Sequence, residues 1–96
     1  MNVAVFKVTL RLPENQSLKG KRRVISSLST RVRNKFNVSI AEVEAADSWQ
    51  LATLGVACVS NSSRHAGEVL SGVLDYIENR EDVELVHHEQ ETMTGF

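Results

Sequence analysis

The sequence has little of several residue types that mark particular classes of protein. Its single cysteine, Cys58, cannot form a disulfide within the chain, which fits a reducing compartment and an inert buried thiol. The longest stretch without charge, residues 48–63, is too short and too polar to cross a membrane. No basic and apolar leader opens the sequence, so we expect a cytoplasmic protein with no membrane partner.

What is present is the composition of one globular domain. Apolar residues make up 42% and charged residues 24% of the 96 residues, values near the average for soluble proteins. A chain of this length is too short for two independent cores. We therefore expect a single domain over residues 1–96, with a poorly ordered tail at 90–96.

The charges are strongly separated along the chain. Residues 1–41 carry nine cations and one acid, a balance of +8, whereas residues 42–96 carry two cations and eleven acids, a balance of −9. Two explanations are open. The chain either presents a basic surface to an anionic partner, or its two halves attract one another within the fold.

Two segments have the apolar spacing of amphipathic helices. The first follows Ser17, a candidate N-cap, and continues to Phe36, with cations on the face opposite its apolar stripe. The second covers residues 66–77, where apolar side chains recur every three or four positions.

Four segments are typical of strands. Residues 3–12 alternate between apolar and polar side chains until Pro13 ends the pattern. Residues 38–44 alternate less cleanly, which indicates an edge strand with a bulge, and residues 49–60 are apolar on both faces, as in a central strand. A weaker strand begins at residue 83 and fades into a polar tail.

The order strand, helix, strand, strand, helix, strand predicts an α+β protein with the ferredoxin-like βαββαβ fold. In this fold both helices cover one face of a four-stranded antiparallel sheet whose central strands are the first and the third. The other face stays uncovered and would carry mixed residues such as Val5 and Lys7. An uncovered, half-apolar face favours pairing of subunits, so we expect a homodimer through it.

The outer face of the first helix is the candidate site for an anion or RNA. Its cations are Lys19, Lys21, Arg22, Arg23 and Arg33. Such side chains bind phosphates without an aromatic platform. Stacking of bases on the sheet is not expected, because the third strand has no aromatic residue and Phe6 lies on the core side of the first. The alternative is a solvated helix face without a partner.

No arrangement of catalytic or metal-binding residues is recognisable. His87 and His88 are neighbours on a strand and therefore point to opposite faces. The start of the first helix, residues 17–21, lacks the glycine-rich loop of nucleotide sites. We therefore expect no enzyme, no metal and no cofactor, and a pocket that uses Glu42, Asp47 or His87 is a weaker alternative.

The single tryptophan, Trp49, follows a predicted turn at residues 46–48. An indole in this position either caps the core at the rim of the hairpin or anchors a partner. Both interpretations remain open from the sequence.

Three stretches of the sequence form a recognisable set: residues 17–22 (SLKGKR), 35–43 (KFNVSIAEV) and 49–57 (WQLATLGVA), the last followed by Ser60-Asn61. Together they resemble the YlxP-like family of small bacterial proteins of unknown function. Only Gly20 departs, where relatives usually carry an acidic or polar residue. The resemblance implies a ferredoxin-like fold without established catalytic residues or cofactor. Members are often encoded among translation and ribosome-maturation genes, which implies, by association, a role near RNA or the ribosome.

Overall fold

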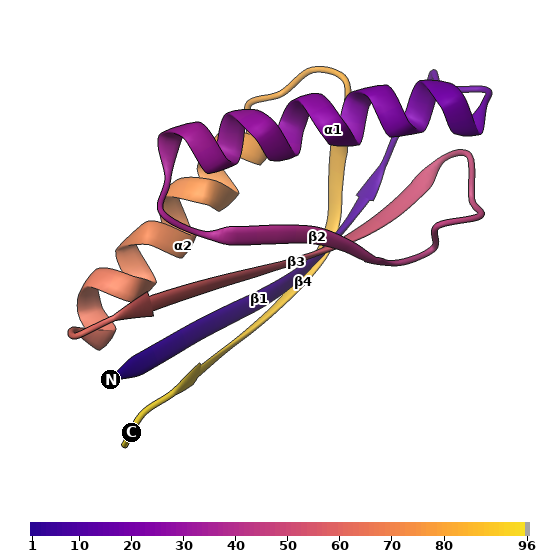
Figure 1. Ribbon diagram of the computed structural model, residues 1–96. Coiled ribbons are helices and arrows are strands. Elements are labelled where there is room, and N and C mark those ends of the chain that lie inside the picture. The colour runs from indigo at the N-terminus through magenta and orange to yellow at the C-terminus, as the bar shows by residue number, and fades with distance from the viewer. Residues whose placement is uncertain (96) are drawn as a thin grey trace.

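The computed structural model describes residues 1–95 and confirms the predicted ferredoxin-like fold (Figure 1). Its elements are β1 (Asn2–Arg11), α1 (Leu18–Lys35), β2 (Ser39–Glu44), β3 (Leu51–Ser60), α2 (Ser63–Glu78) and β4 (Glu84–Met93). The strands form one antiparallel sheet in the order β2-β3-β1-β4, so β1 and β3 are central as expected. No helix among these residues is long and apolar enough to span a membrane.

The core lies between the sheet and the two helices. Alternate residues of β1 and β3 point into it, so that Val8 lies opposite Leu54 in the register and both are buried. Leu28 of α1 and Val73 of α2 close the core from the other side. Cys58 is also buried, as predicted.

Both ends of α1 have identifiable capping contacts. The Oγ of Ser17 accepts a hydrogen bond from Gly20 N at 2.9 Å, which confirms the predicted N-cap. A Cβ at position 20 would collide with Oδ1 of Asn15, so a larger residue there would require the Asn15 side chain to move. At the other end, the backbone N–H of Phe36 donates to Val32 O at 2.8 Å.

The imperfect alternation of β2 has a structural cause. Its register with β3 shifts between Glu42 and Glu44, which confirms the predicted bulge in an edge strand. The shift turns Val43 onto the uncovered face of the sheet, where a Cβ on Gly55 would lie 3.0 Å from it.

The strand β4 is longer than the sequence predicts. It pairs with β1 as far as Met93, which lies opposite Val3, so the expectation of a fading strand and a poorly ordered tail is wrong for residues 90–93. The side chains of this stretch are exposed, and its place in the sheet comes from backbone hydrogen bonds to β1. Phe96 lies outside the described residues.

Candidate functional site

The outer face of α1 presents a continuous group of exposed cations and hydroxyls. They border a shallow depression of about 610 Å³. We call this group the α1 basic surface, and it consists of Lys19, Arg22, Arg23, Ser26, Ser27, Thr30 and Arg31. At 1.5 Å per residue it extends roughly 18 Å along the helix. Arg31 was not among the predicted site residues, although it follows Arg23 by eight positions and Ser27 by four.

Other cations of the first half of the chain are paired with acids of the second half. Lys7 Nζ lies 3.2 Å from Glu44 Oε1 and 3.7 Å from Glu89 Oε2. The hydrogen bond from Lys7 to Glu44, together with the negative charge of both carboxylates, raises the pKa of Lys7. Arg11 Nη2 lies 2.8 Å from Glu84 Oε2. Part of the charge separation is therefore compensated within the fold.

The cations of the α1 basic surface have no such partners. Within residues 1–95, none of its lysines and arginines forms an ion pair. Lys19, Arg22 and Arg23 also lie in the first two turns, at the positive end of the helix dipole, and the first turn carries no acid. Cations are disfavoured at this end of a helix. Their contacts therefore reveal no stabilising role in the fold.

The cations at the C-terminal end of α1 differ in this respect. Arg33 Nη1 donates to Ile40 O at 3.3 Å, so this predicted site residue also ties α1 to β2. Lys35 Nζ lies 5.8 Å from the ring centre of Phe36 and 5.5 Å from that of Tyr76. Both cations occupy the last turn, where the helix dipole favours positive charge.

The prediction that Lys21 contributes to the outer face is wrong, because its side chain is fully buried. Its Nζ donates to three backbone carbonyls, those of Ala45 at 2.7 Å, Leu51 at 3.1 Å and Ala46 at 3.2 Å. An ammonium group has three protons, and these carbonyls take them all. Glu42 Oε2, at 2.9 Å from Nζ, therefore neutralises the charge without a hydrogen bond.

The sequence contained a signal for the position of Lys21. It precedes Ile25 by four residues, Leu28 by seven and Val32 by eleven, which is the spacing of the buried stripe of α1. A polar residue in that register indicates a buried group with partners.

Trp49 does not cap the core, because it is 57% exposed. Its carbonyl accepts a hydrogen bond from Asn15 Nδ2 at 2.5 Å, and the same Nδ2 donates to Ser17 O at 2.7 Å. Gln50 Nε2 donates to Asn15 O at 3.3 Å. The loop of residues 45–50, here called the Trp49 loop, is therefore held against the start of α1.

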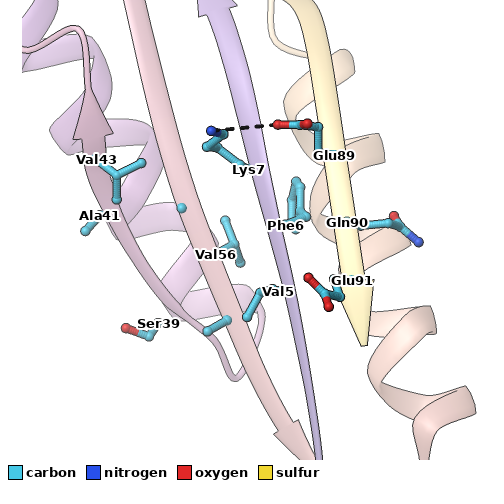
Figure 2. A pocket seen from close by; sticks show the side chains of 12 residues that line it. Val5, Phe6, Lys7, Ser39, Ala41, Val43, Val56, Glu89, Gln90 and Glu91 are labelled. Atoms are coloured by element: carbon cyan, nitrogen blue, oxygen red, sulfur yellow. Dashed lines mark ion pairs between the residues drawn. The ribbon is translucent and has the colours of Figure 1, made fainter. Parts of the chain in front are cut away.

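The uncovered face of the sheet carries a second depression, of about 590 Å³. Figure 2 shows Lys7 in the middle of this face with Glu89 beside it. Towards the start of β1, three apolar side chains lie side by side on neighbouring strands. We call them the apolar row, and they are Val59, Val3 and Met93.

The residues of the weaker catalytic alternative do not come together. Glu42 lies beside buried Lys21 on the helix side of the sheet. His87 lies opposite Thr9 on the uncovered face, whereas His88 lies opposite core residue Val8, which confirms that the two histidines point apart. Among residues 1–95 no three His, Cys, Asp or Glu side chains are placed to hold a metal ion.

Comparison with known proteins identifies the family. Residues 3–90 match the family described as "Protein of unknown function (DUF503)". This chain belongs to the DUF503 family. It is also 44% identical over 68 residues to "Uncharacterized protein YlxP" of Bacillus subtilis (strain 168), a match that covers 71% of this chain and 74% of that protein. The YlxP-like resemblance is confirmed, and it assigns no function to this DUF503 protein.

Solved structures add support for the fold alone. The structure titled "De novo designed protein Foldit4" aligns over the full length of both chains with a TM-score of 0.56 and 14% identity. A transposase structure, "Structure of the REP associates tyrosine transposase bound to a REP hairpin", aligns over 99% of this chain and 58% of its own with a TM-score of 0.47 and 9% identity. A score this low carries no argument.

The region shared with the DUF503 family includes both the α1 basic surface and the Trp49 loop.

Proposed function

We propose that this DUF503 protein is a non-enzymatic RNA-binding protein that docks on the phosphate backbone through the α1 basic surface. One observation carries the proposal: Lys19, Arg22 and Arg23 are exposed, unpaired among the described residues, and placed where the helix dipole disfavours them. Charged side chains that destabilise their helix, with no contact in the fold that offsets this cost, are typical of functional sites. Phosphate groups would supply the missing compensation.

The hydroxyl groups of the α1 basic surface favour RNA over a simple anion. Ser26, Ser27 and Thr30 lie between the cations of the first turns and Arg31. Double-stranded RNA is recognised mainly through phosphates and 2′-hydroxyls. A surface roughly 18 Å long, with hydroxyl groups between the cations at its two ends, matches both, whereas a single phosphate ion would use only part of it. Structured RNA, ribosomal RNA included, is the expected partner.

The salt dependence of binding tests the proposal. We expect a labelled RNA hairpin, followed by fluorescence anisotropy, to bind with a log–log salt slope of about −3.6, as four phosphate contacts to a duplex predict. Arg22→Glu combined with Arg23→Glu should lower the affinity by about 10- to 100-fold and reduce the slope by about 2.

A charge reversal on the other helix provides the matched control. Arg64 is exposed on α2, and its contact with Glu68 at 3.2 Å is an ordinary surface pair. Arg64→Glu should leave RNA affinity within about twofold of the parent value, because long-range screening limits the effect of a distant charge. A loss in Arg64→Glu as large as that in the Arg22→Glu, Arg23→Glu double variant, or binding that is insensitive to salt, would contradict a site on α1.

The apolar row favours a second role, the formation of a homodimer through the uncovered sheet face. Val59 is 60% exposed and lies beside Val3 and Met93 on the face opposite to the helices. Because a twofold pair joined there leaves both α1 helices outside, dimerisation and RNA binding are compatible.

A further inference from the structure

The Trp49 loop combines an exposed indole with a tightly held backbone. A single exposed apolar side chain is common in soluble proteins and means little by itself. Here, however, the carbonyl of Trp49 is bound by Asn15, that of Gln50 accepts from Leu12 N at 2.8 Å, and Gln50 N donates to Ser48 Oγ at 3.3 Å. A rigid backbone that presents an aromatic ring loses little conformational entropy on binding.

The same loop is fastened to the start of α1 from two directions. Asn15 bridges Trp49 O to Ser17 O, the carbonyl of the N-cap residue. Lys21 Nζ reaches Ala46 O and Leu51 O, on either side of the tryptophan. Figure 1 shows the β2–β3 loop and the N-terminal end of α1 at the same end of the molecule.

The geometry of the helix places one unpaired cation on the flank nearest the loop. Lys21 points into the hairpin, and each residue adds about 100° around the helix. Arg22 is therefore rotated by about 100° from the direction of the hairpin, and Arg23 by about 160°. Lys19, one turn before Arg22, lies at the axial level where the loop is attached.

The opposite flank carries more negative charge. Arg23 lines a crevice together with Glu14, Glu81 and Asp82, and of these three acids Asp82 is paired with Arg80. The carboxylates of Glu14 and Glu81 would repel a polyanion. On the hairpin side, Glu42 is paired with Lys21, and Glu44 is paired with Lys7. Asp47 forms no ion pair among the described residues. Among the described residues, two carboxylates without an ion pair, Glu14 and Glu81, therefore lie on the Arg23 flank and one, Asp47, lies in the Trp49 loop, so a phosphate backbone on α1 meets fewer such carboxylates towards Trp49.

From these contacts we infer that the α1 basic surface and Trp49 form one composite site for RNA with an unpaired nucleotide next to a helical stem. Phosphates of the stem meet Lys19 and Arg22, and the unpaired base stacks on the indole. The inference rests on the proposed function and specifies its substrate class. Every base has a π face, so the stacking requires no particular sequence and adds about 5- to 150-fold in affinity.

Intrinsic fluorescence tests this site directly, because the chain has a single tryptophan. The probes are a blunt RNA hairpin and the same hairpin with two unpaired nucleotides at its 3′ end. Both should bind, but the second should bind about tenfold more tightly and quench the tryptophan emission. Trp49→Ala should bind the two RNAs equally, and Trp49→Phe should keep part of the preference.

The controls separate this inference from the proposed function. Trp49→Ala removes an exposed ring, so its thermal unfolding temperature should match that of the parent. If both RNAs bind equally and neither quenches the tryptophan emission, the proposed stacking on Trp49 is wrong, while RNA binding through α1 stands. The exposed indole would then be assigned to contact with a protein partner. If neither RNA binds to the parent protein, both ideas fail.

Discussion

At the scale of single residues, the turn between α2 and β4 holds a two-point ion pair. Arg80 Nε and Nη2 lie 2.9 Å and 2.6 Å from the two carboxylate oxygens of Asp82. These hydrogen bonds lower the pKa of Asp82 below its usual value of 3.8, against the opposing effect of partial burial. A carboxyl group with a lowered pKa in the folded state stabilises the fold above its unfolded pKa, and this stabilisation is lost as the pH falls through the folded pKa.

We therefore expect Asp82→Asn to lower the free energy of unfolding by about 0.2–1 kcal/mol at pH 7, the range of a partly exposed pair. The two proteins should converge in strong acid, well below the lowered pKa of Asp82, because the parent carboxyl group is then protonated as well. Urea denaturation at both pH values measures the difference. Glu81→Gln is the control, because Glu81 is an exposed neighbour that forms no ion pair among residues 1–95. A difference in unfolding free energy that persists unchanged in acid would show that the effect does not come from the ion pair of Asp82 with Arg80.

At the scale of elements, Lys21 fastens α1 to the β2–β3 hairpin. Burial of an ammonium group is costly unless it is paired and hydrogen-bonded, and here three carbonyls and Glu42 supply both kinds of contact. The closest acceptor is the carbonyl of Ala45, whose φ of 63° lies in the left-handed region that residues other than glycine rarely adopt. The contact with Lys21 thus helps to hold a strained turn.

Replacing Lys21 by methionine should cost about 2–4 kcal/mol of stability, since it leaves buried carbonyls and the Glu42 carboxylate without their partner. Chemical denaturation measures this loss. The neighbouring substitution Arg22→Met, on the exposed face, should change stability by less than about 0.5 kcal/mol. A Lys21→Met protein as stable as the parent would show that the hairpin is held by other contacts.

The positions of the elements also show how much of this structure the sequence predicts. Periodicity located the six elements, and the uneven alternation around Val43 correctly indicated a bulge. Periodicity failed to predict the strand at residues 90–93, because their side chains are exposed on both faces of the sheet. This part of β4 depends on pairing with β1, which is distant in the sequence. At the candidate site, the cations were found from composition and spacing. Lys21 was wrongly assigned to the exposed face of α1, because the prediction gave its charge more weight than its position in the buried stripe.

At the scale of the whole molecule, the two faces have different character. The helix face carries cations that form no ion pair within the described part of the chain, whereas the sheet face carries compensated charges around Lys7 and the apolar row at one end. The separation of charge in the sequence thus has two outcomes in the fold: internal ion pairs on the sheet face and an exposed basic surface on α1.

Sedimentation velocity tests the proposed dimer. Val59→Lys places a charge in the apolar row and should shift the protein to monomer at a concentration where the parent is dimeric. Val86→Lys is the matched control, since Val86 is 58% exposed and lies outside the row. A parent protein that stays monomeric at high concentration, or equal effects of both substitutions, would contradict pairing through this face.

The pairing of β1 with β4 also has a consequence for the timing of synthesis. Val3 and Met93 are partners in the sheet, and ninety residues separate them in the chain. At a translation rate of about 5–20 residues per second, their synthesis is roughly 5–18 s apart. Throughout that interval one edge of β1 has no partner of its own. For several seconds the nascent chain therefore exposes an unpaired strand edge that only the completion of β4 can close.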